Sequence, residues 1–322
     1  MSLLAVRDLT ISFRGPRNPL KVVTNLNFAI DKAEVFGLVG ESGCGKSLTA
    51  LSIMRILPQN AFTEGEVIYN GRDLLKLDNE SMRRLRGKEL SMIFQEPMTS
   101  LNPVLTVGYQ IAEVLKTHEG SSSREALDRT VELLRAVRIP SPEIRLKEYP
   151  HQMSGGMRQR VMIAMAIACN PHLLIADEPT TALDVTIQAQ ILDLLMDIKR
   201  EKTMSILLIT HDIGVIAENA DRAAVMYAGR IMEEARVSSI LDKPKHPYTI
   251  GLLESLPKTK GVPLKPIPGS VPRPDMLPPG CKFSDRCSCR IPDCLKEEPL
   301  LREIISGHFA RCIRAEEMHW ES

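Results

Sequence analysis

Apolar positions along the first 240 residues follow two periods, one typical of strands and one of helices. Residues 3–13 alternate around Leu9, Ile11 and Phe13, which predicts a strand. Short apolar runs that end at a glycine or a polar residue predict further strands at 34–40, 65–71, 90–94, 173–176 and 205–210. Apolar residues at helical spacing predict helices at 46–57, 157–169 and 185–200. Strands that alternate with helices indicate an α/β fold, with a mostly parallel sheet covered on both faces.

The pattern changes twice along the chain. From about residue 96 to 156 it is helical, as in "SREALDRTVELLRAV", where Leu127, Val131 and Leu134 share a face, so we expect a helical insert. After about residue 243 the chain becomes proline-rich, which is typical of a linker, here around one short helix. We therefore predict one domain at 1–243 and a small cysteine-rich C-terminal extension at 244–322.

Composition excludes some partners. The 322 residues carry a formal net charge of +1 and only 4% aromatic side chains, so neither nucleic acid nor an anionic membrane surface is indicated. No apolar run approaches the ~18–20 residues that cross a membrane. The first residues, "MSLLAVRDLT", do not resemble a signal peptide. We expect the chain to stay in the cytosol and to reach any membrane through protein partners.

The stretch "GESGCGKS" at 40–47 fits the phosphate-binding pattern G-x-x-x-x-G-K-S and lies between a predicted strand and a predicted helix. Its glycines let the backbone turn so that N–H groups point at phosphate oxygens, and the helix start adds positive potential. Lys46 then reaches the β- and γ-phosphates and the Ser47 hydroxyl binds Mg²⁺. Cys44 is expected to contribute only its N–H group. The predicted nucleotide-binding residues here are Gly40, Glu41, Ser42, Gly43, Cys44, Gly45, Lys46, Ser47 and Leu48.

The segment "LLIADEP" at 173–179 predicts the metal end of the same site. Asp177 emerges at the end of a buried strand, where it is placed to hold Mg²⁺ through water. Glu178 is then placed to orient or deprotonate the attacking water.

Three further side chains are candidates for the nucleotide site, and each also has a purely structural interpretation. Gln95 ends a strand and is a candidate contact for both Mg²⁺ and the attacking water, although an isolated glutamine also suits an ordinary surface position. His211 follows the strand "LLIT" and is a candidate γ-phosphate contact or a structural histidine. Phe13 is a candidate for stacking on adenine, or a core residue.

The segment "MSGGM" at 153–157 predicts a second anion-binding surface. Ser154, Gly155 and Gly156 open a predicted helix, whose free N–H groups attract negative charge. No lysine accompanies them, so a plain helix start with a serine cap is the alternative.

Taken in order, "GESGCGKS", Gln95, "MSGGM", "LLIADEP", "TALD" (181–184) and His211 resemble the nucleotide-binding domains of ABC transporters. This resemblance implies a P-loop NTPase (RecA-like) core with a β-subdomain and the helical insert, and an ATPase that uses Mg²⁺. It also implies that Ser154, Gly155 and Gly156 close over the ATP of a partner subunit. The family's usual segment is Leu-Ser-Gly-Gly-Gln, and Met153 and Met157 depart from it.

The segments "FQEPMTSLNP" (94–103) and "HPYTIGLLESLP" (246–257), together with the cysteine-rich tail, resemble the ATP-binding subunits of dipeptide, oligopeptide and nickel importers. This resemblance implies a second ATPase subunit, two transmembrane permease subunits and, indirectly, an external solute-binding protein. It places the chain as a peripheral protein on the cytoplasmic face of the plasma (inner) membrane.

In that branch the C-terminal cysteines resemble ligands of a [4Fe–4S] cluster, at Cys281, Cys287, Cys294 and Cys312. Thiolates also suit Zn²⁺, and reduced free thiols are a third interpretation. Cys289 is an additional thiol that competes for a place in any such site.

The sequence is also compared with what two other functions would require. A soluble ABC ATPase of DNA repair or translation usually carries long coiled-coil insertions or two fused ATPase domains, and this chain shows neither. A metal-dependent regulatory module built on the cysteine tail would not require the hydrolytic residues, so Glu178 and His211 argue against it.

Overall fold

The computed structural model describes residues 2–15, 18–95, 100–181, 183–256 and 266–318, which include every candidate site residue. Positions 96–99, 182 and 257, which belong to the quoted segments, lie outside these ranges. The chain divides into two compact units. The first unit comprises Met1–Asp31, Val35–Leu75 and Leu208–Ser322, and the second comprises Lys32–Glu34 and Lys76–Leu207. The predicted domain boundary at 243/244 stays a prediction.

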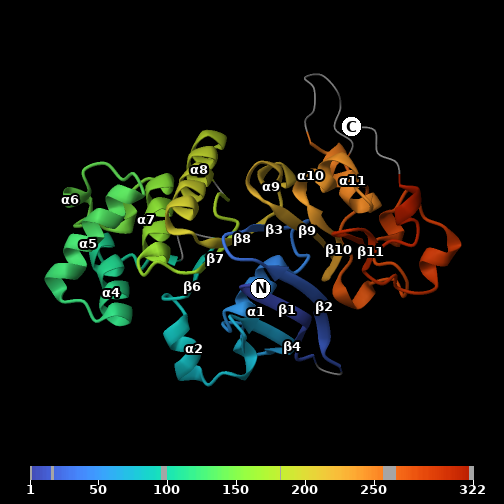
Figure 1. Cartoon of the computed structure of the whole chain (residues 1–322), viewed down its shortest axis with the longest axis horizontal. Helices are drawn as coiled ribbons and strands as arrows, with labels where there is room; N and C mark the ends of the chain where they lie inside the picture. Colours follow the sequence, from blue (N-terminus) through green and yellow to red (C-terminus); the bar gives the residue numbers. More distant parts are fainter. Residues whose placement is uncertain (1, 16–17, 96–99, 182, 257–265, 319–322) are drawn as a thin grey trace. The chain divides into compact units, whose positions relative to one another are not determined.

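The first unit contains an antiparallel sheet near the N-terminus, in the strand order β2-β1-β4-β5 (Figure 1). Its strands are β1 (Leu4–Phe13), β2 (Leu20–Ile30), β4 (Ala61–Tyr69) and β5 (Arg72–Asp73). The strand predicted at 65–71 is β4, which begins four residues earlier because Gly65 is not a strand boundary. Gly65 has a φ of +99° at a register shift opposite Arg7, where an added Cβ would lie 2.6 Å from a backbone oxygen. It therefore marks a β-bulge.

The same unit holds strands in the order β11-β12-β10-β9-β3. Only β3 and β9 pair in parallel within this set, while β9–β10, β10–β12 and β11–β12 are antiparallel. The sheet is therefore mixed, and the expectation of a mostly parallel sheet was wrong for this part of the chain. The strands are β3 (Val35–Val39), β9 (Arg222–Tyr227), β10 (Arg230–Arg236), β11 (Arg302–Ile305) and β12 (His308–Ala310).

The helices of the first unit are α1 (Lys46–Ile53), α9 (Ile213–Asn219), α10 (Val237–Asp242) and α11 (Pro247–Glu254). Helix α1 ends four residues before the predicted end at residue 57. The cause is Arg55, which adopts a left-handed φ of 52°. The N–H groups of Arg55 and Ile56 donate to the carbonyls of Ser52 and Leu51, which is the hydrogen-bond pattern of a Schellman C-cap.

The second unit combines a parallel strand pair with a group of helices. Strands β6 (Leu90–Ile93) and β7 (Leu173–Asp177) pair in parallel and are buried, as their apolar runs predicted. Helices α4, α5 and α7 contact one another, and Figure 1 shows them in green. The helices of this unit are α2 (Asn79–Leu85), α4 (Val107–Glu119), α5 (Ser123–Ala136), α6 (Pro142–Arg145), α7 (Gly155–Ile167) and α8 (Val185–Lys202). Strand β8 (Ser205–Thr210) crosses the division between the two units.

Candidate nucleotide site and cysteine cavity

The loop at residues 40–47, called the P-loop below, connects β3 to α1 in the first unit. Two of its glycines are required by the backbone. An added Cβ at Gly40 would lie 2.0 Å from the carbonyl oxygen of Met226, and Gly45 adopts a φ of +108° as the N-cap of α1. The predicted strand–loop–helix context is therefore present, with the positive end of the α1 dipole at the loop.

Lys46 is the positively charged residue of this loop, and its side chain folds back over it. Its Nζ donates hydrogen bonds to the carbonyl oxygens of Gly40 (2.6 Å) and Glu41 (3.1 Å), and only 4% of the residue is exposed. Burial raises the pKa of the nearby Cys44 thiol, which therefore stays neutral at ordinary pH. The Lys46 ammonium group therefore lies within the loop where the sequence predicts phosphate binding.

Asp177 and Glu178 lie at the end of β7 in the second unit, and both are buried, at 3% and 9% exposure. Glu178 adopts a left-handed φ of 44°, an uncommon conformation for glutamate and one that is concentrated at functional sites. Its Oε2 accepts hydrogen bonds from Nε2 of Gln95 (3.1 Å) and Oγ1 of Thr181 (2.8 Å). The structure thus brings together Gln95 and Glu178, which the sequence had assigned to the same attacking water.

The Ser-Gly-Gly segment begins α7, as predicted. Ser154 is the N-cap, and its hydroxyl accepts a hydrogen bond from the N–H of Met157 at 3.3 Å. An added Cβ at Gly156 would lie 2.9 Å from Cγ2 of Ile187 on α8, so packing also favours glycine there. With Met157, Arg160 and Leu183, these residues line an open hollow of about 450 Å³. The hollow is large enough for phosphate groups. The serine cap by itself is no evidence for phosphate binding, because capping residues of this kind are common at helix starts.

His211 and Phe13 occupy the ends of strands in the first unit. His211 follows β8 with an exposed side chain, directly before Asp212, which caps α9. Phe13 is the last residue of β1 and is half-buried. Their predicted contacts with γ-phosphate and adenine stay predictions.

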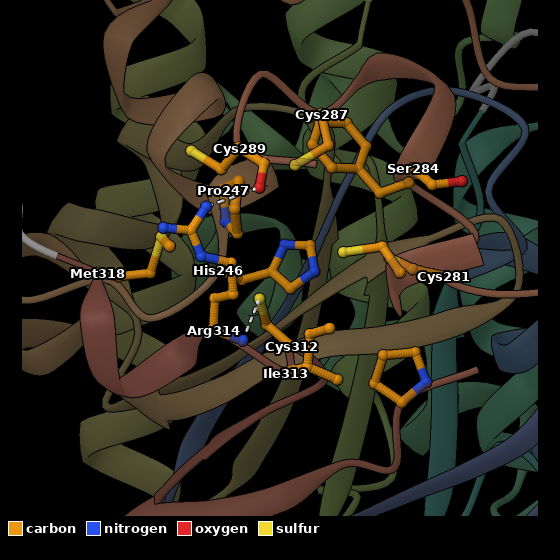
Figure 2. Close-up of a pocket in the computed structure, with 13 residues that line it drawn as sticks. His246, Pro247, Cys281, Ser284, Cys287, Cys289, Cys312, Ile313, Arg314 and Met318 are labelled. Atoms are coloured by element: carbon orange, nitrogen blue, oxygen red, sulfur yellow. Dashed lines mark hydrogen bonds between the residues drawn. The ribbon is translucent and has the colours of Figure 1, made fainter. Parts of the chain in front are cut away.

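The C-terminal cysteines gather around one small cavity of about 20 Å³ in the first unit (Figure 2). The cavity is lined by His246 and by Cys281, Cys287, Cys289, Cys294 and Cys312. Burial raises the pKa of Cys287 to about 12 and that of Cys312 to about 11, and neighbouring cysteines add to both shifts. The N–H of Cys281 donates to the carbonyl oxygen of Cys294 at 2.8 Å, which ties two of the four predicted ligands together.

The cavity meets only part of what a metal site requires. The donor type fits, because five thiols face one cavity. Among the residues that the structure describes, however, no group of three or more His, Cys, Asp or Glu side chains is placed to hold a metal ion. The predicted iron–sulfur or zinc ligation is therefore not confirmed.

Sequence reasoning missed three side chains that contact candidate residues. Thr181 holds Glu178, while Tyr248 and Arg286 contact Glu41 in the P-loop. Thr181 and Tyr248 lie in segments quoted above and Arg286 lies in the cysteine-rich tail, but no local pattern indicates which residue each one contacts.

Comparison with known proteins assigns the class. The sequence profile described as ABC transporter matches residues 23–181, and the one described as oligopeptide/dipeptide transporter, C-terminal region, matches 232–294. A Sinorhizobium fredii protein named "Probable peptide ABC transporter ATP-binding protein y4tR" is 53% identical over 321 residues, or 98% of this chain and 96% of that protein. A Brucella ovis protein, provisionally named a peptide import ATP-binding protein, is 49% identical over 98% of each chain.

Solved structures agree with the sequence relatives. The ATP-binding cassette MJ0796, determined as a dimer bound to ADP and Pi, matches 73% of this chain and 98% of its own with a TM-score of 0.65 at 27% identity. The cbiO1 protein of Clostridium perfringens, with a TM-score of 0.63 at 24% identity, shares the fold over 74% of this chain and 90% of its own. The fold is thus that of an ABC ATPase cassette, α/β with a mixed sheet. The chain belongs to the ABC transporter family, as one of its ATP-binding proteins with an oligopeptide/dipeptide transporter C-terminal region.

None of the relatives named here is a DNA repair or translation factor, so the alternative of a soluble ATPase in those processes has no support. Within the part of the chain that the structure describes, no helix is both long and apolar enough to cross a membrane.

Proposed function

We propose that this chain is the ATP-hydrolysing subunit of an ABC importer for di- or oligopeptides, or for nickel. The observation that carries this proposal is a sequence identity of 53% and 49%, over 98% of this chain, to proteins named for peptide transport or peptide import. The profile match at residues 232–294 supports the same branch through a separate part of the chain.

In this proposal the P-loop and Lys46 bind the phosphates of ATP, and Phe13 stacks on the adenine. Ser47, Gln95 and Asp177 hold Mg²⁺, because hydroxyl, amide and carboxylate oxygens are the donors that this ion prefers. Held by these residues, Mg²⁺ would neutralise negative charge on the phosphates.

Glu178 orients and deprotonates the attacking water, and His211 contacts the γ-phosphate. Support for the role of Glu178 comes from its geometry. Hydrogen bonds from Gln95 and Thr181 hold its carboxylate in one orientation, in a buried position with a left-handed backbone. A fixed carboxylate orients water without first losing its own freedom.

Ser154 and the N–H groups of Gly155 and Gly156 serve the nucleotide of a second ATPase subunit. ATP can drive two subunits together only if it binds the closed pair better than the open one, and this contact supplies the difference. The dimeric, ADP- and Pi-bound state described for MJ0796 supports such an arrangement. The pair moves two transmembrane permease subunits, with a solute-binding protein outside, and the chain is peripheral on the cytoplasmic side.

The cysteine cavity is proposed to hold a [4Fe–4S] cluster at Cys281, Cys287, Cys294 and Cys312, on donor chemistry alone. Zinc or free thiols are the other interpretations. Purification without oxygen followed by iron, sulfide and zinc analysis distinguishes the three, because a metal-free, stably folded protein excludes both metal sites.

The proposed activity is tested with the full assembly purified from detergent-solubilised membranes. We expect multi-span proteins to co-purify and Glu178→Gln to slow phosphate release at least roughly 100-fold, the usual contribution of a general base, while ATP still binds. Glu201→Gln, the same change at an exposed glutamate of α8, is the matched control. Unchanged hydrolysis in Glu178→Gln refutes the assignment of the base, and co-purification of ribosomes or DNA instead of membrane proteins refutes the transport role.

A further inference from the structure

Glu41, the second residue of the P-loop, is bound by two residues of the C-terminal extension that lie more than 200 positions away. Its backbone N–H donates to the hydroxyl of Tyr248 at 3.0 Å. Its carboxylate forms a two-point ion pair with Arg286, whose Nη1 and Nη2 lie 2.5 Å and 2.9 Å from Oε2 and Oε1. All of these residues belong to the first unit, so one compact body contains the whole arrangement.

The carbonyl of Glu41 points the other way, into the loop. It accepts hydrogen bonds from Nζ of Lys46 (3.1 Å) and from the N–H of Cys44 (3.3 Å). The residue that Tyr248 and Arg286 hold is therefore the same residue that orients the phosphate-binding lysine. A displacement of Glu41 changes the position of Lys46 directly.

Arg286 is itself rigidly held. Only 6% of its side chain is exposed, and Nε donates to the carbonyl oxygen of Pro268 at 2.8 Å. The guanidinium also lies 5.7 Å from the ring centre of Tyr227, within reach of a cation–π contact. Hydrogen bonding to Glu41 raises the pKa of Arg286, so the guanidinium stays charged at every pH at which the protein folds. A planar, buried guanidinium with a two-point carboxylate contact fixes geometry in a way that a lysine does not.

Charge gives Arg286 a second effect on the loop. Without its guanidinium, the Glu41 carboxylate would stand uncompensated in the loop that has to receive a polyanion. The Glu41 side chain is only partly exposed, at 28%, so its negative charge would be only partly screened by water and would repel a bound polyanion.

We propose that Arg286 and Tyr248 are positioning residues of the nucleotide site, through which the C-terminal extension sets the affinity of the P-loop for ATP. This inference rests on the proposed function, namely that the P-loop binds ATP. Neither side chain is assigned a contact with ATP itself, because both act through Glu41 and thereby on Lys46.

The test is isothermal titration of the full chain with Mg²⁺ and ATP, on variants whose folding is first verified by circular dichroism. We expect Arg286→Met to weaken ATP binding by about tenfold or more, which corresponds to ~1.4 kcal/mol or more. Arg230→Met is the matched control, because Arg230 is a similarly buried arginine whose carboxylate partner is Glu298, also in the C-terminal extension but not in the P-loop. We expect its affinity to stay within twofold of the unmodified chain.

A charge signature separates positioning from general stability. In the double variant Glu41→Gln/Arg286→Met the unpaired carboxylate is gone, so we expect tighter ATP binding than in Arg286→Met alone. Arg286→Lys keeps the positive charge but loses the two-point contact with the carboxylate. We expect its ATP affinity to lie between those of Arg286→Met and the unmodified chain. If Arg286→Met fails to fold, Tyr248→Phe removes only the hydroxyl that accepts from Glu41, and we expect ATP binding weakened by about threefold.

The outcomes are distinct. The inference applies only where Lys46→Ala abolishes ATP binding. It is then overturned if Arg286→Met, or Tyr248→Phe where it replaces that variant, binds ATP within twofold of the unmodified chain. It is also overturned if Arg230→Met weakens ATP binding as much as Arg286→Met does. If Lys46→Ala binds ATP as the unmodified chain does, the proposed function itself fails.

Discussion

At the scale of single residues, two separate requirements, close packing and anion binding, both favour glycine at position 156. Its Cα faces Ile187 so closely that a methyl group would lie 2.9 Å from Cγ2 of that side chain. Its N–H also belongs to the half-buried first turn of α7, where an anion is proposed to bind. A glycine there therefore does not by itself demonstrate a phosphate contact.

The two requirements are separated by a pair of substitutions. Gly156→Ala should lower stability by about 1–3 kcal/mol, as overpacking usually does, and should also lower the ATPase rate of the assembly. Adding Ile187→Ala makes room for the methyl group, so we expect thermal stability to recover in the double variant but hydrolysis to stay low. Full recovery of both would mean that packing alone requires the glycine.

The residue scale also shows how much of the site the sequence could predict. The strand–loop–helix context of the P-loop could be predicted from the sequence, because its glycines and lysine lie within eight consecutive residues whose backbone geometry is local. Gln95 and Glu178 could be assigned to one site because each lies within two residues of the end of a buried strand, β6 or β7. The contact of Arg286 with Glu41 spans 245 positions and depends on how the tail folds back, which no local pattern encodes.

At the scale of elements, apolar runs predicted the strands that are buried on both faces, such as β7, while several strands were missed. Strand β10 is the clearest case, because it contains Glu233 and Glu234, both buried. The Glu233 carboxylate accepts hydrogen bonds from the N–H groups of Lys245 and His246 and contacts His308 Nε2 at 2.7 Å. Polar residues inside a strand weaken an apolar pattern, and only the folded partners explain their burial.

Helix α11 provides a prediction about pH, because its N-cap is a buried histidine. The Nδ1 of His246 accepts a hydrogen bond from the N–H of Tyr248 at 3.0 Å. Burial, with a smaller effect of the charge on Arg311, lowers the pKa of His246 to about 3. In the unfolded chain the pKa of a histidine is about 6.5, so between these values the unfolded state binds more protons. Stability is therefore lost as the pH falls below about 6.5.

By pH 5 this single group should lower the free energy of unfolding by about 2 kcal/mol relative to pH 7. His246→Asn keeps a side-chain acceptor at the N-cap but does not titrate. We expect urea unfolding at pH 7 and pH 5 to differ by about 2 kcal/mol less in His246→Asn than in the unmodified protein. An equal pH dependence in the two proteins would show that His246 does not carry this effect.

At the scale of the whole molecule, the proposal makes each chain contribute to two different nucleotide sites. Lys46 serves the ATP bound by its own P-loop, whereas Ser154 serves the ATP of the partner subunit. Substitutions at the two positions should therefore affect ATP binding differently in the isolated chain and in the assembly. This difference is the most direct consequence of a nucleotide shared between two subunits.

Ser154→Arg places a bulky cation on an exposed helix start, where it should block the approach of a partner without unfolding the chain. We expect the isolated Ser154→Arg chain to bind ATP within twofold of the unmodified chain, while the purified assembly loses most of its ATP hydrolysis. Lys46→Ala should abolish ATP binding already in the isolated chain. If Ser154→Arg weakens ATP binding by the isolated chain as strongly as Lys46→Ala does, the Ser-Gly-Gly segment serves its own P-loop. If instead hydrolysis by the assembly is unaffected by Ser154→Arg, the segment does not contact nucleotide at all, because closure around ATP requires this surface to come close to the phosphates.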